Sequence, residues 1–175
     1  MKVDYLIIGQ GIAGTLLSRC LIAAGKTVVV FDDNDPATAS RVAGGIINPV
    51  TGKRLVTSWM INELLPFAKQ TYTELEQELQ LQIVKECEIV DFHANIEQAR
   101  LFEERASAEP MYLHVNSVGD KWNDMFRFNY GAGVISPCLL IDILPMLIGW
   151  RKYLQRLDML RAEWFDWNQC VVENG

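Results

Sequence analysis

The sequence predicts an α/β fold built on a parallel sheet, and three observations predict it. Residues 3–8 form a short apolar run, and the motif Gly9-Gln10-Gly11-Ile12-Ala13-Gly14 follows directly. A second run, over residues 27–31, is rich in β-branched side chains. A strand, a helix and a second strand within about thirty residues match the size of a βαβ unit. Because neither strand alternates apolar and polar residues, we expect the sheet to be covered on both faces.

Each glycine of the motif has its own physical task. Gly9 allows the tight turn out of the first strand, Gly11 lets the backbone approach a pyrophosphate, and Gly14 lets the helix pack closely on the sheet. The helix that follows, with Ile12 and Ala13 in its first turn, points N–H groups and the positive end of its dipole at the phosphate. The motif therefore predicts a site for a dinucleotide.

An acidic residue stands at the end of the second strand. Asp32 lies at the distance from Gly14 at which an acid bonds the hydroxyls of a nucleotide ribose, and Asp33 is the alternative for that role. The glycines and the acid together predict a Rossmann-like domain. They do not separate FAD from NAD, so an NAD(P)-dependent dehydrogenase remains an open alternative.

The remaining elements are expected in the following order. The first helix covers residues 12–24 and ends at Gly25. Small residues, glycines and Pro49 predict a loop over 34–54 with at most one helical turn. A helix follows over 58–80, bent or divided at Pro66. Beyond it we expect strands at 83–92, 111–115 and 126–130, a charged helix at 95–108, a helix over 137–157 and a strand over 160–172.

This pattern predicts two parts. Residues 1–80 and 136–175 form an incomplete Rossmann-like domain, and residues 81–135 form an inserted α+β segment with antiparallel patterning. Residues 173–175 are typical of a hairpin turn whose second strand is missing, so we expect an incomplete chain.

Composition excludes several classes of protein. The net charge of −6 and the pI of about 4.9 argue against nucleic-acid binding. The four cysteines form no C-x-x-C pair, and neither histidine has a ligand-like spacing, so we expect free thiols and no metal site. The amino terminus lacks the pattern of a signal peptide, and the apolar stretch at 138–150 is too short and interrupted to cross a membrane. We therefore expect a cytoplasmic protein without a membrane segment.

Two segments resemble the D-amino-acid-oxidase-like (DAO) flavoproteins. The run Ala39-Ser40-Arg41-Val42-Ala43-Gly44-Gly45-Ile46 is similar to the segment that follows the second strand in that family. The run Gly131-Ala132-Gly133-Val134-Ile135-Ser136-Pro137 resembles the place where the family's chain returns from the substrate domain to the FAD domain. The resemblance covers most of the chain, closely over residues 3–50 and loosely afterwards.

The resemblance implies FAD as the cofactor and assigns further residues to its site. Ser40 and Arg41 are expected near the pyrophosphate or ribitol, and contacts to adenine are expected within residues 166–168. Asp32 replaces the glutamate that is usual in the family, and the shorter side chain is expected to reach one ribose hydroxyl. The residues expected near the isoalloxazine ring are Ala43, Gly44, Gly45 and Ile46.

The function that the resemblance implies is oxidation of a C–N bond. An amino acid or other small amine gives a hydride from its α-carbon to flavin N5. No catalytic residue is assigned, because the family's carboxylate-binding residues lie in a carboxyl-terminal half that this sequence lacks. A non-catalytic fragment of such an enzyme is therefore a third interpretation, and a homo-oligomer is compatible with the sequence.

Overall fold

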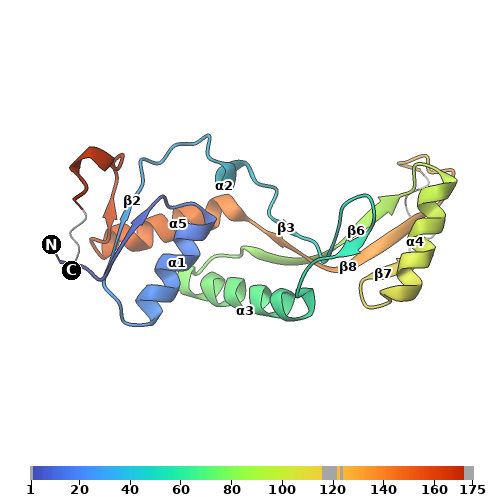
Figure 1. Cartoon of the computed structure of the whole chain (residues 1–175), viewed down its shortest axis with the longest axis horizontal. Helices are drawn as coiled ribbons and strands as arrows, with labels where there is room; N and C mark the ends of the chain where they lie inside the picture. Colours follow the sequence, from blue (N-terminus) through green and yellow to red (C-terminus); the bar gives the residue numbers. More distant parts are fainter. Residues whose placement is uncertain (1, 116–121, 123, 172–175) are drawn as a thin grey trace. The chain divides into compact units, whose positions relative to one another are not determined.

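The computed structural model describes residues 2–115, 122 and 124–171, and it divides into two compact units (Figure 1). The first unit comprises Met1–Gly44, Glu76–Gln82 and Asp142–Gly175, and the second comprises Gly45–Leu75 and Ile83–Ile141. Residues 45–75 thus group with the second unit, whereas the sequence pattern placed them in the first domain. The division into a cofactor domain and a substrate domain stays a prediction.

The first unit contains the predicted parallel sheet. Its strand order is β1-β2-β9, with β1 at Tyr5–Ile8, β2 at Val28–Phe31 and β9 at Leu160–Arg161. The centre of the sheet is buried, since Val28, Val29 and Val30 are at most 6% exposed. The edge strand β1 differs from the expectation of two covered faces, because three of its four side chains are exposed: Tyr5, Leu6 and Ile8.

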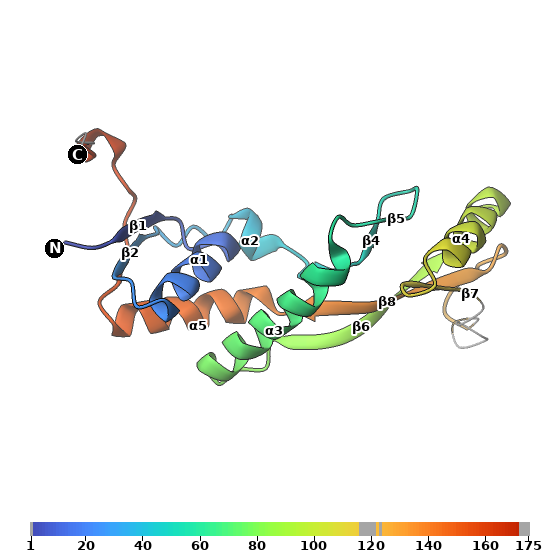
Figure 2. The same ribbon diagram turned by 60° about the horizontal axis from the view of Figure 1, so that its bottom comes forward.

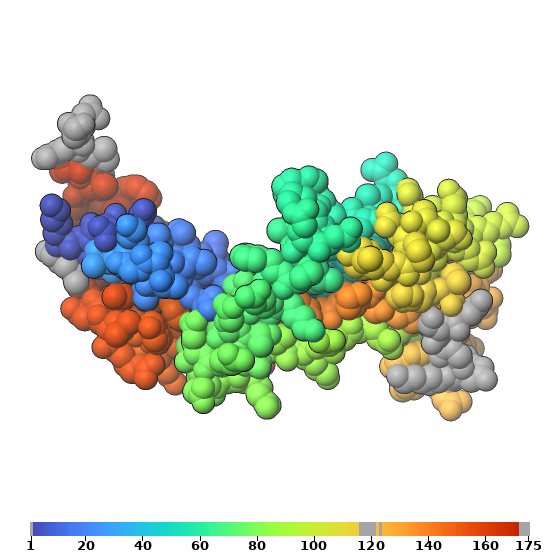
Figure 3. Space-filling view, turned by 90° about the horizontal axis from the view of Figure 1, so that it is seen from below, coloured from blue at the N-terminus to red at the C-terminus, as the bar shows by residue number. Residues whose placement is uncertain are grey.

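Two helices pack together beside this sheet. Helix α1 (Ile12–Ala23) lies along α5 (Ile143–Arg156) in both ribbon views (Figures 1 and 2). In the space-filling view, the blue surface of α1 meets the orange-red surface of α5 (Figure 3). The indole N–H of Trp150 donates to Ser18 Oγ at 2.8 Å, and both side chains are fully buried. A short helix α2 (Ala39–Val42) and a 3-10 turn η2 (Trp167–Gln169) complete the unit.

The second unit is built on an antiparallel sheet. Strands β3 (Ile46–Ile47), β8 (Ala132–Ile141) and β6 (Val84–Phe92) are neighbours in that order, and β7 (Leu113–Val115) also pairs with β8. A hairpin of β4 (Val50–Thr51) and β5 (Val56–Thr57) stands apart from this sheet. Helix α3 (Ile61–Leu79) runs through Pro66 without dividing and contributes to both units.

Helix α4 (Ile96–Ala108) closes the core of the second unit. It begins after the N-cap Asn95, whose Oδ1 accepts from the Gln98 N–H at 2.9 Å. Its Phe102 is fully buried, and a Cβ atom at Gly133 of β8 would lie 2.2 Å from the Phe102 ring. Glycine at residue 133 therefore makes room for this aromatic ring against the sheet.

Three expectations about secondary structure were wrong. The helix expected from Pro137 is instead the end of β8, because the apolar run over Ala132–Ile141 pairs with β6, and α5 begins only after Asp142. The strand expected at 126–130 does not form; Phe126 and Phe128 instead pack against Phe92, with ring centroids 5.0 and 4.9 Å away. The strand from residue 160 ends at Arg161, where its pairing with β2 ends. The hairpin turn expected at 173–175 lies outside the described residues.

Candidate functional site

The glycine turn joins β1 to α1 at the carboxyl end of the sheet. Gly9 has a φ of +91°, which favours glycine, and its N–H donates to the carbonyl of Phe31 at 2.8 Å. A Cβ atom at Gly14 would lie 1.9 Å from the Gly9 carbonyl oxygen, and one at Gly11 would lie 2.7 Å from Ser40 Oγ. A side chain at Gly14 would therefore clash with the backbone of the turn, whereas one at Gly11 would force the Ser40 hydroxyl to move.

Ser40 brings α2 to the first turn of α1. Its hydroxyl oxygen accepts a hydrogen bond from the Ile12 N–H at 3.0 Å, although the two residues are far apart in the sequence. The first four N–H groups of a helix have no partner within the helix. Ser40 satisfies one of them, and those of Ala13 and Gly14 lie in the same turn. This end of α1 therefore offers backbone donors to an anion.

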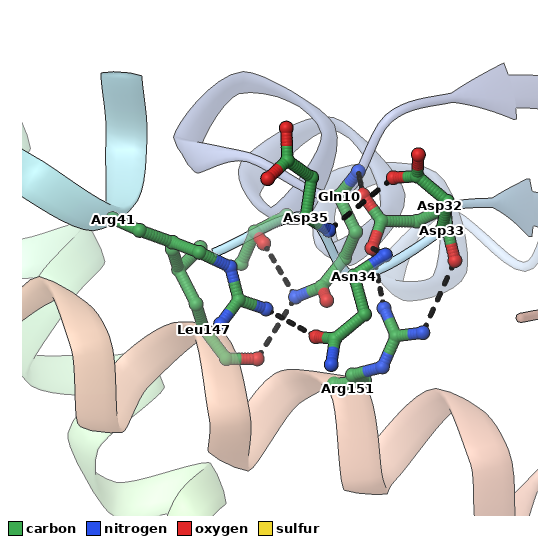
Figure 4. A network of polar contacts seen from close by, with 9 residues as sticks. Gln10, Asp32, Asp33, Asn34, Asp35, Arg41, Leu147 and Arg151 are labelled. Carbon is green, nitrogen blue, oxygen red and sulfur yellow. Dashed lines mark hydrogen bonds and ion pairs between the residues drawn. The ribbon is translucent and has the colours of Figure 1, made fainter. Parts of the chain in front are cut away.

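Asp32 is fixed to the glycine turn. Its Oδ2 accepts from the Gln10 N–H at 2.8 Å, and its Oδ1 accepts from the Asn34 N–H at 3.0 Å. Arg151 of α5 forms an ion pair with Oδ1, and its second terminal nitrogen donates to the Asp32 carbonyl at 3.1 Å. Figure 4 shows Asp32 between the glycine turn and Arg151. The predicted ribose acid therefore stands beside the predicted phosphate turn.

Gln10 holds the turn from inside the unit. The side chain is buried, and its Nε2 donates to Thr15 Oγ1 at 3.1 Å and to the Leu147 carbonyl at 2.9 Å (Figure 4). Its Oε1 is buried without a hydrogen-bond partner among the described residues. Gln10 thus connects the turn to both α1 and α5.

A pocket of about 130 Å³ opens at the ends of β1 and β2. Phe165 anchors one wall, because its ring packs edge-on against Phe31 at 5.2 Å and against Trp167 at 5.0 Å. Trp164 and Trp167 are exposed by 75% and 66%, so their rings are accessible to a ligand. The lining residues are Ile8, Gly9, Phe31, Asp32, Asp33, Glu163, Trp164, Phe165 and Trp167.

One acid next to the pocket wall has a perturbed titration. The backbone N–H of Asn168, and then the side chain of Gln169, stabilise the carboxylate of Asp166 and lower its pKa. The bond from the Asn168 N–H to the Asp166 carboxylate also caps the 3-10 turn η2. These contacts fix the backbone on which Trp167 is carried.

Most of the predicted site residues belong to the first unit. The glycine motif, Asp32 and Ser40 are brought together, and Arg41 reaches the same loop by a hydrogen bond to Asn34 Oδ1. Ala43 and Gly44 are exposed. Asp33 lines the pocket, but none of these hydrogen bonds joins it to the glycine turn. Gly45 and Ile46 belong to the second unit, where Ile46 pairs with Leu140.

Sequence reasoning did not assign three residues of this site: Gln10, Arg151 and Trp164. Gln10 entered only as a member of the glycine motif, and Arg151 carried no signal at all. Trp167 lies within the range 166–168 in which adenine contacts are expected, and it lines the pocket. The adenine contact itself stays a prediction.

Two other kinds of site find no support in the described part of the chain. No helix there is long and apolar enough to span a membrane. Among the same residues, no group of three or more histidine, cysteine, aspartate or glutamate side chains is placed to hold a metal ion.

Comparison with known proteins gives a family and a fold. A family model described as FAD dependent oxidoreductase (DAO) matches residues 4–158. Glycine oxidase from Geobacillus kaustophilus has a TM-score of 0.70 at 15% identity, and the match covers 91% of this chain and 45% of that chain. L-Amino acid deaminase from Proteus myxofaciens, solved with anthranilate, has a TM-score of 0.69 at 14% identity, covering 91% and 37%. L-Proline dehydrogenase from P. horikoshii has a TM-score of 0.66 at 13% identity, covering 91% and 43%.

Because the sequence identities are low, these likenesses show a shared fold and nothing about activity. The chain spans less than half the length of each of these three proteins.

Proposed function

Since the chain belongs to the FAD-dependent oxidoreductase (DAO) family, whose model matches residues 4–158, we propose that its first unit binds FAD. We further propose that the whole enzyme oxidises the C–N bond of an amino acid or other small amine. The hydrogen bond from the Gln10 N–H to Asp32 Oδ2 is the main support for the proposal. It joins the glycine turn, which we expect to bind the pyrophosphate, to the carboxylate that we expect to bind the ribose.

The residues present fit a dinucleotide. A Cβ atom at Gly14 would meet the Gly9 carbonyl oxygen and one at Gly11 would meet Ser40 Oγ, so α1 and α2 both pack closely on the turn. The first turn of α1 supplies N–H donors and the positive end of a helix dipole for the pyrophosphate. Asp32 lies beside it with a side chain that is 14% exposed, which is accessible enough to accept from a ribose hydroxyl.

The charges of the pocket support one orientation of the ligand. Three carboxylates line it, from Asp32, Asp33 and Glu163, and they would repel a pyrophosphate. The pyrophosphate therefore belongs at α1, and the uncharged adenosine end belongs in the pocket. The exposed rings of Trp164 and Trp167 offer surfaces on which an adenine base can stack.

The substrate class rests on the relatives of similar fold, whose names state glycine oxidase, L-amino acid deaminase and L-proline dehydrogenase. Bound FAD supplies an acceptor for a hydride from the carbon next to the substrate nitrogen. The residues of this chain bind and orient the cofactor, and none of them is assigned to act on the substrate. The tasks of this chain are thus to bind the cofactor and to fix its position.

The test is retention of flavin by the 175-residue chain. The purified protein is mixed with FAD or with NAD, passed through a desalting column, and its absorbance spectrum is recorded. We expect bands near about 370 and 450 nm to travel with the protein, as bound oxidised flavin gives. Retention of NAD without FAD would replace this proposal with a nicotinamide-dependent dehydrogenase. Retention of neither would identify the chain as a fragment with an incomplete site.

A further inference from the structure

The contact between Arg151 and Asp32 has consequences for which nucleotides the site accepts. Arg151 is only 9% exposed, and it approaches Asp32 at two points. One terminal nitrogen pairs with Oδ1, and the other donates to the backbone carbonyl of the same residue at 3.1 Å. The first contact holds one carboxylate oxygen and the second holds the backbone of Asp32, while the Gln10 N–H holds the other carboxylate oxygen.

The hydrogen bonds around Asp32 leave little capacity for a ligand. Each carboxylate oxygen accepts about two hydrogen bonds. Oδ1 already accepts two, from Arg151 and from the Asn34 N–H, and Oδ2 accepts one, from the Gln10 N–H. One acceptor position remains, on Oδ2. A ribose presents two hydroxyl groups, so the carboxylate as held can bind only one of them.

We propose that Arg151 is a positioning residue that limits the Asp32 carboxylate to one ribose hydroxyl and so sets how the site distinguishes the two hydroxyls of an adenosine ribose. The inference rests on the proposed nucleotide function and deepens it. Arg151 acts through Asp32, because both of its terminal nitrogens are engaged with that residue (Figure 4).

The same contact predicts which nucleotides are rejected. The guanidinium is neutralised by Asp32, so it does not serve as a phosphate clamp. Asp33 and Glu163 add negative charge to the pocket that Asp32 lines. A phosphate group on the adenosine ribose would meet these carboxylates without a free cation of Arg151 to offset them. The site therefore takes nucleotides whose ribose hydroxyls are both unmodified.

The experiment measures the affinity of the 175-residue chain for ADP, 2′-deoxy-ADP and 3′-deoxy-ADP by isothermal calorimetry. In the unchanged protein, we expect one of the two deoxynucleotides to bind roughly tenfold more weakly than the other, as loss of a single bond to a charged acceptor implies. In Arg151→Met, Oδ1 regains an acceptor position that the second hydroxyl can use, and this contrast is expected to fall below about threefold. Arg156→Met, the same change five residues later on α5, is expected to keep the wild-type contrast.

A merely structural role gives a different result. It would weaken all three ligands by the same factor and leave the contrast unchanged, which would overturn the proposal. Failure of the unchanged protein to bind ADP, or binding of both deoxynucleotides with equal affinity, would also overturn it. If Arg151→Met does not fold by circular dichroism, Arg151→Ala removes the same donors with a smaller side chain, and an unchanged contrast there is equally decisive.

The two proposals fail separately. If FAD is retained by the unchanged protein and Arg151→Met keeps the contrast, the inference about Arg151 is wrong and the flavin function stands. If the deoxynucleotides show the predicted contrast but FAD is not retained, the inference about Arg151 stands and the flavin function is wrong.

Discussion

The carbonyl oxygen of Gly9 occupies the space in which a side chain at Gly14 would begin, since an ideal Cβ there would lie only 1.9 Å away. Real Cβ atoms do not approach a backbone oxygen so closely, and neither backbone segment moves independently. Gly9 belongs to the turn, and Gly14 belongs to α1. Their contact sets how closely the helix packs on the sheet, which is the task that the sequence pattern assigned to the third glycine.

Gly14→Ala is therefore expected to destabilise the first unit. The added methyl group must push α1 away from the turn, and overpacking of this kind costs about 1–3 kcal/mol or more. Urea unfolding followed by circular dichroism measures the loss. Gly44→Ala is the matched control, because a Cβ at Gly44 meets nothing within 4 Å. Equal stability of the two variants would contradict the assigned role of Gly14.

Ser40→Ala tests the connection between α2 and α1. The substitution removes the acceptor for the Ile12 N–H, and the loss of a capping oxygen costs about 1 kcal/mol. Ser107→Ala is the control, because that hydroxyl only donates to the Glu103 carbonyl on an exposed face of α4. We expect unfolding midpoints in urea to fall clearly for Ser40→Ala and to stay nearly constant for Ser107→Ala. Equal shifts would show that the Ser40 bond contributes nothing of its own.

Local patterns explain how far the sequence could predict this site. The glycine turn, Asp32 and the first helix were predictable, because each depends on residues that are close along the chain. Gln10 and Arg151 were not, since Gln10 bonds to Leu147 of α5 and Arg151 of α5 bonds to Asp32 after β2, and these pairs meet only when the first unit is folded. A buried glutamine between two glycines and an arginine inside an amphipathic helix give no signal without that packing.

The boundary at Pro137 shows the opposite failure. Serine followed by proline is a strong start signal for a helix, and here it lost to the strand pairing of the whole run Ala132–Ile141. Pairing with β6 involves most of the strand, so a long-range interaction outweighed a local preference. Trp164 and Trp167 lie outside a strand for a different reason, because the pairing of β9 with β2 ends after Arg161.

The stability of the first unit is expected to depend on pH through Asp4. Its carboxylate accepts from the Thr27 N–H and hydroxyl, each at 2.8 Å, and the bond to the N–H is the main reason that its pKa is lowered from 3.8. Stability from this carboxylate is present above the unfolded pKa and is lost as pH falls through the folded one. Unfolding of wild type and Asp4→Asn should differ at about pH 6, and the difference should vanish only as the pH falls below 3.8. A difference that persists into acid would show that the charge is not responsible.

Thiol reactivity is expected to separate the cysteines. Burial, and then the neighbouring Cys87, raise the pKa of Cys138 to about 11, whereas Cys20 and Cys170 are exposed. Only the thiolate reacts, so iodoacetamide at about pH 8 should alkylate Cys20 and Cys170 at least tenfold faster than Cys138. Peptide mass spectrometry over time gives the rates, and the difference should vanish in urea. Fast labelling of Cys138 in the folded protein would mean that the core around β8 opens readily.

Tryptophan fluorescence tests the proposed orientation of the nucleotide. AMP is the useful probe, because its adenine cannot accept excitation energy from tryptophan, and quenching therefore requires contact between the base and an indole ring. Trp164 and Trp167 line the pocket beside Asp32, so AMP should quench the wild-type emission and should bind more weakly once either ring is removed. Loss of one stacking surface costs about 1–3 kcal/mol, which is roughly fivefold or more in Kd.

The variants Trp164→Leu and Trp167→Leu are compared with Trp59→Leu, which removes an exposed tryptophan of the second unit. If the adenine lies in the pocket, quenching and affinity fall in the first two variants and persist in the third. If Trp59→Leu abolishes the quenching instead, the base binds elsewhere. The carboxylates of Asp33 and Glu163 would then border a pocket that the nucleotide does not enter.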